Sequence, residues 1–323
     1  MTWSRVMFAV ANPDSVDSAV LDKVVHLTVA LGAEFELFHC ADGSLVTQPQ
    51  RPGSFEGEHE VGELIERRQQ ELEHRAQGLR RPGLQVRSSV AWDYPIHEGI
   101  VRQVLRHQPD LLIVQPSRHH GPWMLGYTDY KLIETCPCPL LLMKTTRPYV
   151  ESCLIAAVDP MHEHDKPAAL DDVILDAATV LSTALSGKLW LFHARAPWPQ
   201  VKPSLSHQPA AVREDVEIVH SRSVEERVLQ LAHRHGIARN NIELVEGHAV
   251  DALPFFARRE SADIVAIGAV SRSLLKRIVI GHTAEVLLDG LDCDLLIMKP
   301  PGFRSRVHLP AEFPTPTTSA AHP

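Results

Sequence analysis

Short apolar runs alternate with amphipathic segments along most of the chain. Apolar runs bounded by turn residues predict buried strands, and the segments between them carry apolar residues at helical spacing. Within 61–79, for example, Val61, Leu64, Leu72 and Ala76 share one stripe, and charged residues occupy the opposite face. Because the strand runs are apolar on both faces and helices separate them, the pattern predicts parallel sheets covered by helices on both sides.

The predicted strands form two sets of five. Their expected limits are 5–11, 34–40, 84–91, 110–115 and 139–144 in the first set, and 152–158, 188–194, 241–247, 263–268 and 294–299 in the second. The predicted fold class is therefore α/β, with two tandem doubly wound (Rossmann-like) domains that each contain a five-stranded parallel sheet.

Internal repeats support the same division. The string "DLLIV" at Asp110 returns as "DIVAI" at Asp263, "CPLLLMK" at Cys138 as "CDLLIMK" at Cys293, and "LFHC" at Leu37 as "LFHA" at Leu191. The offsets are all roughly 153 to 155 residues, which indicates a tandem duplication. We predict domain 1 over 1–149 and domain 2 over 150–303. Residues 304–323, rich in Pro, Ser and Thr, predict a disordered tail.

Charge and composition restrict the classes of partner that the chain is expected to bind. A formal charge of −8 and a pI near 6.2 disfavour nucleic acid as a partner. No apolar run approaches the length of a membrane span and the opening "VMFAVA" is too short for a signal peptide, so we expect no membrane association and a cytoplasmic location.

The five cysteines are odd in number and lie in apolar runs, which fits reduced thiols. Cys136 and Cys138 could form half of a metal site, but their spacing favours packing, and we predict no metal site.

A candidate ligand site lies where two strands of the second domain end. In open α/β sheets, ligands bind outside the carboxyl ends of the strands, at the point where strand order reverses. The first and fourth strands of domain 2 end at Asp159 and Gly268, and Gly281 opens the next helical pattern. Gly268 would let a backbone approach closely, and a helix N-terminus favours phosphate. The alternative is that both glycines serve only tight turns.

These residues resemble a known motif. Nucleotide-binding members of the universal stress protein (UspA) family have an Asp after the first strand and G-x-x-G, nine residues, then G-[ST] after the fourth. Asp159 in "LIAAVDP", Gly268 and Gly281 match, and 272–280 keep the spacing. The tandem layout and "IGHTAEVLLDGLDCDLLIMKPPGF" resemble the two-domain E-type members. The resemblance implies an adenine-nucleotide alpha-hydrolase-like fold and a non-catalytic role in survival under stress, DNA-damaging stress included.

The second domain departs from the family motif at two positions. Ser271 replaces the second glycine and adds a Cβ where backbone should meet phosphate; His282 replaces the Ser or Thr after the last glycine, with Thr283 one place later. Arg272 could steer an anion or lie on a solvated loop. The predicted, degenerate nucleotide site thus consists of Asp159, Gly268, Ser271, Arg272, Gly281, His282 and Thr283.

The first domain departs further, with Asn12 in place of the Asp and Gln115 in place of the first glycine. We expect that it has lost nucleotide binding. No P-loop, dinucleotide, zinc-protease or hydrolase signature is present, so we predict no catalytic residues.

These observations lead to a non-catalytic protein that requires no cofactor. The alternatives are an ATP-binding switch or slow ATPase that uses domain 2, and a carrier of a small ligand. By resemblance, the two domains should pair within the chain through their last strands, near 139–144 and 294–299. Further association into a homo-oligomer stays open.

Overall fold

The computed structural model describes residues 2–41, 55–116, 125–161, 169–195, 210–269 and 287–309. The first repeat contains β1 (Arg5–Ala9), η1 (Pro13–Ser15), α1 (Ser18–Leu31), β2 (Glu34–Ala41), α2 (Phe55–Leu79), β3 (Val86–Trp92), α3 (Ile96–His107), β4 (Leu111–Val114), α4 (Tyr127–Thr135) and β5 (Leu140–Leu142). The second contains β6 (Cys153–Ala157), α5 (Ala169–Ala184), β7 (Lys188–Arg195), α7 (Ala210–Arg234), η4 (Arg239–Asn241), β8 (Ile242–Glu246), α8 (Ala249–Arg259), β9 (Ile264–Gly268) and β10 (Asp294–Met298). All ten predicted strands are present.

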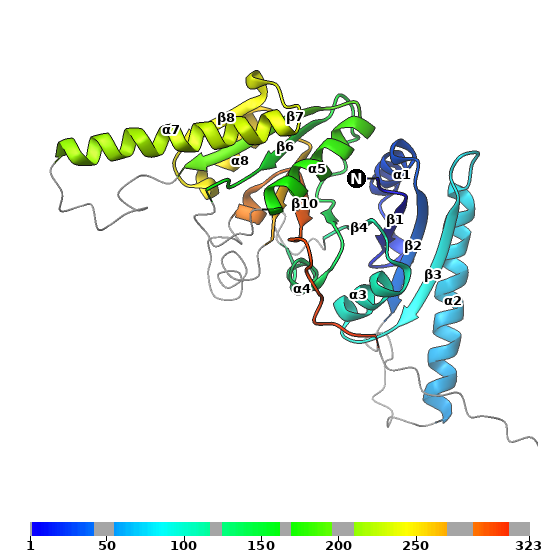
Figure 1. Ribbon diagram of the computed structural model, residues 1–323. Coiled ribbons are helices and arrows are strands. Elements are labelled where there is room, and N and C mark those ends of the chain that lie inside the picture. Colours follow the sequence, from blue (N-terminus) through cyan, green and yellow to red (C-terminus); the bar gives the residue numbers. More distant parts are fainter. Residues whose placement is uncertain are drawn as a thin grey trace, which may run out of the picture.

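The strands form one continuous ten-stranded sheet (Figure 1). Its order is β3-β2-β1-β4-β5-β10-β9-β6-β7-β8, so the two repeats have the same internal order. Neighbours within each repeat are parallel, and only the pair that joins the repeats, β5 and β10, is antiparallel. Two tandem doubly wound domains, each with five parallel strands, were predicted, and the structure confirms them.

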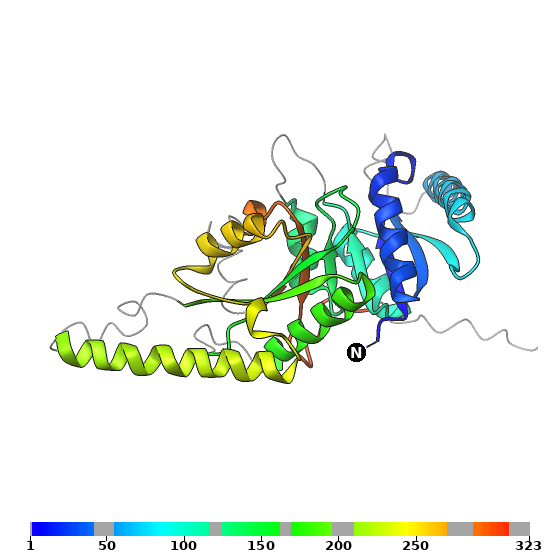
Figure 2. The same ribbon diagram turned by 90° about the horizontal axis from the view of Figure 1, so that it is seen from above.

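Helices cover both faces of the sheet, as Figure 2 shows from above. One apolar cluster packs α1, α2, α5 and α7 against one face, through residues such as Val24, Leu72, Ile174 and Val228. A second cluster packs α3, α4 and α8 against the other face. The central strands, such as β4 and β10, therefore contribute alternate side chains to two cores, which explains why their sequences are apolar at successive positions.

The repeats meet at a pseudo-two-fold axis between β5 and β10. Leu141 lies opposite Leu296, and these two leucines occupy the same position in the two repeats. The flanking pairs, Leu140 with Ile297 and Leu142 with Leu295, are related by the same exchange. Pairing of the two domains through their last strands, which the resemblance implied, is thus what the structure contains.

Two buried lysines extend this symmetry beyond the strands. Lys144 follows β5, and its Nζ donates to the carbonyl oxygens of Leu288, at 2.7 Å, and Leu291 of the second repeat. Lys299 follows β10, and its Nζ donates to the carbonyl oxygens of Ile133 and Glu134 at the end of α4. Each lysine therefore satisfies carbonyl groups at the C-terminal end of a helix in the other repeat.

The segment after β10 crosses to the first repeat (Figure 1). Val307 is buried in the core that contains α3 and α4, and Arg102 Nε of α3 donates to the His308 carbonyl oxygen at 3.2 Å. Over 304–309 the structure therefore differs from the disordered tail predicted from residue 304. The apolar side chain of Val307 explains the difference, because its burial favours an ordered position. Residues 310–323 lie outside the described residues.

No helix in the described part of the chain has the length and apolar character needed to cross a membrane.

Candidate functional site

The candidate site is built on two neighbouring strands of the second repeat. β6 pairs with β9 in parallel, with Ala156 opposite Ala266, and β6 has its other neighbour, β7, on the opposite side. Strand order therefore reverses between β6 and β9. Asp159 follows β6 and Gly268 ends β9, so both lie at the carboxyl ends of the two strands, as predicted.

Asp159 is held by the first turn of α5. Its backbone N–H donates to Asp171 Oδ1 at 3.0 Å, and Asp171 is buried. Asp172 lies beside it in the same helical turn. The N-terminus of a helix attracts negative charge, and the first turn of α5 carries two carboxylates of its own, of which Asp172 pairs with Arg234 of α7 at 3.1 Å. The Asp171 carboxylate disfavours a phosphate beside it.

Gly268 is in close contact with the apolar face of α5. A Cβ at this position would lie 2.7 Å from Leu170 Cδ2 and 3.1 Å from Ile174 Cδ1. Because Cβ atoms do not approach other carbon atoms so closely, a Cβ at this position would require the side chain of Leu170 to move. The space beside this glycine is filled by the side chains of the core, which favours the interpretation of Gly268 as a packing residue.

The remaining residues of the predicted site lie outside the described residues. These are Ser271, Arg272, Gly281, His282 and Thr283. Their part in a nucleotide site stays a prediction from the sequence.

Two histidines have matching roles in the two repeats. His193 Nδ1 lies 2.9 Å from the Val158 carbonyl oxygen, and His39 Nδ1 lies 2.9 Å from the Val10 carbonyl oxygen. A carbonyl oxygen only accepts, so each ring donates through Nδ1. Both rings are buried and tie the end of one strand to its neighbour. The equivalent positions of the two histidines, in "LFHC" and "LFHA", thus correspond to the same structural role.

In the first repeat, the residue that replaces the motif Asp has a local structural role. Asn12 Oδ1 accepts the backbone N–H of Asp14 at 3.0 Å and so caps η1. Asp14 in turn pairs with Arg68 of α2, with Oδ2 and Nη1 2.5 Å apart. Gln115 directly follows β4.

A groove lies beside Asp159, between α5 and α7. Its volume is about 990 Å³, and its lining includes Pro160, Asp172, Arg227 and Arg234. The walls combine aliphatic side chains with charges of both signs. Such a surface could hold a small polar molecule, and it lies on the same side of the sheet as Leu170 and Ile174.

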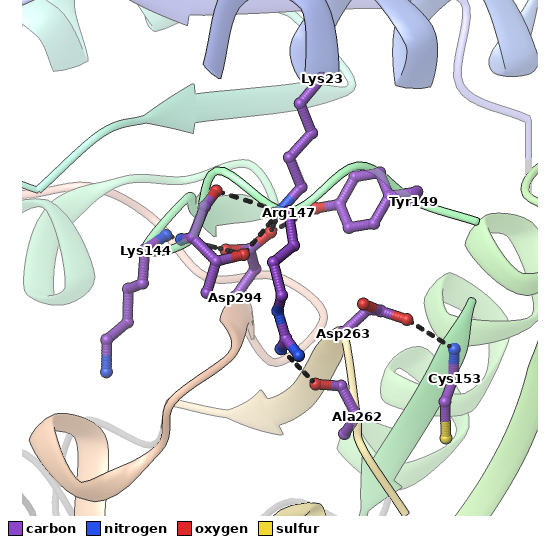
Figure 3. Close-up of polar contacts among 9 residues, drawn as sticks. Lys23, Lys144, Arg147, Tyr149, Cys153, Ala262, Asp263 and Asp294 are labelled. Atoms are coloured by element: carbon purple, nitrogen blue, oxygen red, sulfur yellow. Dashed lines mark hydrogen bonds and ion pairs between the residues drawn. The ribbon is translucent and has the colours of Figure 1, made fainter. Parts of the chain in front are cut away.

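The most extensive buried polar cluster of the described chain is at the junction of the repeats (Figure 3). Asp294 Oδ2 accepts from Lys23 Nζ at 2.5 Å and from the Tyr149 hydroxyl at 2.6 Å. Its Oδ1 accepts from the backbone N–H groups of Lys144, at 2.8 Å, and Thr145, at 2.9 Å. Burial and the nearby carboxylate raise the pKa of Tyr149, which keeps the hydroxyl protonated as a donor.

The sequence alone did not single out this cluster. The one available signal was that Asp294 stands where the first repeat has Pro139, in an otherwise apolar stretch. The linker next to the cluster is fixed as well: Arg147 Nη2 donates to the Ala262 carbonyl oxygen at 3.4 Å. Asp263 Oδ2 accepts the Cys153 N–H at 3.0 Å (Figure 3).

Within the ranges that the structure describes, no group of three or more His, Cys, Asp or Glu side chains is placed to hold a metal ion.

Comparisons with known proteins agree with the duplication. A model of the universal stress protein family matches residues 2–144 and 157–299. Universal stress protein E of Escherichia coli (strain K12) is 22% identical over 331 residues, which covers 97% of this chain and 99% of the relative. The universal stress protein E homolog of Haemophilus influenzae is 21% identical over 246 residues, or 74% of this chain and 77% of the relative.

Solved structures show the same fold. A functionally unknown protein from Pseudomonas aeruginosa PAO1 has a TM-score of 0.67 and 23% identity, with 92% of this chain and 93% of that chain covered. A universal stress protein from Archaeoglobus fulgidus has a TM-score of 0.60 and 14% identity, with 95% and 98% covered. At these identities the likeness shows the fold alone.

Proposed function

The chain belongs to the universal stress protein family, in the tandem form of the E type, and from this premise we propose that it is a non-catalytic stress-response protein. It acts in the cytoplasm and supports survival under stress, including DNA-damaging stress. It requires no cofactor. Two observations carry the proposal. The junction of the repeats is built from buried, paired polar groups around Asp294, whereas in the candidate ligand site the side chain of Leu170 fills the space beside Gly268.

Three features support the absence of tight nucleotide binding. The approach to Gly268 is occupied by α5, and carboxylates lie at the N-terminus of that helix. In addition, Ser271 and His282 replace the two family residues that would contact phosphate. Loss of a donor or intrusion of a side chain costs about 1–3 kcal/mol each, by analogy with unpaired polar groups. Two such losses weaken binding roughly 30-fold to 20,000-fold.

A survival assay tests the stress role. A strain that lacks the gene is exposed to a DNA-damaging agent and complemented with the unaltered gene, with Asp159→Asn or with Asp294→Ala. We expect Asp159→Asn to restore survival to the same extent as the unaltered protein does, because the stress role depends on the paired repeats and not on the candidate ligand site. Loss of survival with a folded Asp159→Asn protein would contradict this, as would full survival without the gene.

The second candidate is an ATP-binding switch or slow ATPase. It is favoured by Asp159 and Gly268, which remain at the carboxyl ends of neighbouring strands. Calorimetry with Mg-ATP decides between the two functions. We expect no tight binding by the unaltered protein and a measurable gain in Ser271→Gly with His282→Ser. Micromolar binding by the unaltered protein would overturn the first proposal, and no gain in the double variant would mean that the site is closed for other reasons.

The third candidate is a carrier of a small ligand, which the groove between α5 and α7 favours. Mass spectrometry of small molecules released from the purified chain distinguishes it from both others, because a carrier would release a bound compound that is not a nucleotide. Sedimentation of the full chain, with and without that compound, would show whether a homo-oligomer forms.

A further inference from the structure

Two cysteines lie together where α4 gives way to β5. Cys136 and Cys138 flank Pro137, and their Sγ atoms are 3.5 Å apart. Cys136 is the C-cap residue of α4, and its backbone N–H donates to the Leu132 carbonyl oxygen at 2.9 Å. Both are free thiols. Hence the two sulfur atoms are already in contact, without any rearrangement of the elements on either side.

The environment makes the two sulfurs unequal. The hydrogen bond between the two sulfur atoms lowers the pKa of Cys136, although burial opposes this, and the ammonium of Lys299 acts in the lowering direction. The same hydrogen bond and desolvation by burial raise the pKa of Cys138. Lys299 is close because it donates to carbonyl oxygens of Ile133 and Glu134 in the same turn of α4. Cys136 is therefore the more acidic thiol of the pair and the one that ionises first.

Two other cysteines of the chain have a different environment. Burial raises the pKa of Cys153 to about 11 and that of Cys293 to about 12. Both therefore remain protonated at neutral pH and react slowly with electrophiles. They provide internal controls for the reactivity of the pair.

We propose that Cys136 and Cys138 are a peroxide-sensitive dithiol that closes reversibly to a disulfide. This inference goes beyond the proposed function and does not depend on it, because it rests on the placement of the two sulfur atoms beside Lys299.

The reaction consumes one hydroperoxide. The Cys136 thiolate attacks the O–O bond and becomes a sulfenic acid, and the leaving oxygen departs as hydroxide and takes up a proton to give water. Cys138 then attacks the sulfenic sulfur, which forms the S–S bond, and the hydroxyl leaves as a second molecule of water once it has gained the Cys138 proton. Two thiols and one hydrogen peroxide thus give one disulfide and two molecules of water.

The position of the pair sets the rate and the reversibility. Cys136 is fully buried and Cys138 partly exposed, so peroxide reaches the thiolate when the last turn of α4 opens locally. Oxidation is thus slower than at an exposed thiolate. A disulfide that spans a single residue is constrained, and a small-molecule dithiol should reduce it again.

The experiment uses the full chain and hydrogen peroxide. After treatment, free thiols are alkylated and the protein is digested without reduction. We expect the peptide that contains Cys136 and Cys138 to lose two hydrogen atoms and to resist alkylation, and dithiothreitol to reverse both changes. The number of free thiols should fall from five to three, and Cys153 and Cys293 should still be alkylated after peroxide treatment. Retention of all five thiols, or oxidation of Cys153 or Cys293 first, overturns the proposal.

Matched variants test the order of the steps. With a dimedone trap, Cys138→Ser should accumulate an adduct at Cys136, because no resolving thiol remains, and Cys136→Ser should give none at Cys138. Cys153→Ser should behave as the unaltered protein. An adduct at Cys138 in Cys136→Ser, or disulfide formation that Cys153→Ser abolishes, contradicts the proposal. The mass measurement on the unaltered chain decides the matter even where a variant fails to fold.

Discussion

Lys23 of α1 and Asp294 of β10 form a buried ion pair that joins the two repeats, with Nζ and Oδ2 2.5 Å apart and side-chain exposures of 1% and 0%. The pair is completed by Tyr149 and by the N–H groups of Lys144 and Thr145 (Figure 3). The Lys23 ammonium and the Asp294 carboxylate compensate each other's charge. Removal of either side chain therefore leaves an uncompensated charge in a site without solvent.

Asp294→Ala should lower the free energy of unfolding by about 3–5 kcal/mol, since it leaves the Lys23 ammonium buried without a counter-charge. The measurement is urea denaturation of the full chain. Asp292→Ala is the matched control, because Asp292 lies two residues away with a 68% exposed side chain and should change stability by at most about 0.5 kcal/mol. A loss below about 1 kcal/mol for Asp294→Ala would show that the pair is not what holds the junction.

Gly268→Ala should destabilise the protein by about 1–3 kcal/mol, because its methyl group overlaps Leu170. Gly290→Ala, in a helical position where a Cβ meets nothing within 4 Å, should be neutral or slightly stabilising. Thermal unfolding of both variants gives the comparison. If Gly268→Ala instead kept full stability, the Leu170 side chain would be able to move aside, and packing would not require a glycine at this position.

Lys299 should make stability depend on pH in the alkaline range. Burial lowers its pKa to about 8 from its usual value near 10.5. Between these values the unfolded chain binds the proton more tightly than the folded chain, so this contribution to stability rises with pH and is smallest below about pH 8. From about pH 7 to about pH 10, the unaltered protein should gain up to about 3 kcal/mol relative to Lys299→Met.

The Lys299→Met variant is the control for this pH experiment. Buried thiols such as Cys293, whose pKa is raised to about 12, lower stability as pH rises, but they are present in both proteins and cancel in the difference. A difference between the two proteins that is constant with pH would mean that Lys299 titrates normally when folded.

Truncation after residue 303 should lower stability by about 1–2 kcal/mol, because it removes the buried side chain of Val307 from the first repeat. Truncation after residue 309 retains this contact and should leave the melting temperature close to that of the full chain. Calorimetry of the two truncated proteins distinguishes the cases. Equal melting temperatures for both would show that Val307 contributes no net stability.

Most of the fold could be predicted from the sequence, because strand and helix patterns are local. Continuous apolar runs such as "DLLIV" and "DIVAI" identified equivalent strands, and their repetition identified the domains. Asp159 and Gly268 were placed correctly at strand ends by a general rule of α/β sheets. The packing of Leu170 against Gly268 could not be predicted, since it depends on how closely α5 approaches β9.

The polar junction is harder to predict for a related reason. Lys23 and Asp294 are 271 residues apart, and neither belongs to a local pattern that indicates the other. In sequence, a Lys in the amphipathic segment of α1 is indistinguishable from a solvated one, yet this side chain is buried. Val307 was missed similarly, because one apolar residue in a polar segment has no periodicity.

The antiparallel join between β5 and β10 also affects how the two halves can evolve. Since it reverses the direction of the sheet, the carboxyl ends of β1 and β4 point toward one edge and those of β6 and β9 toward the other. A substitution at one of these strand ends, such as at Asn12 or Gln115, therefore contacts no equivalent residue of the other repeat. A substitution at Leu141 or Leu296, in contrast, changes the contact between the two repeats. Because both repeats belong to one chain, they are always present in a one-to-one ratio, so the strand ends of each repeat can diverge separately and only the residues of the β5–β10 pair must change together.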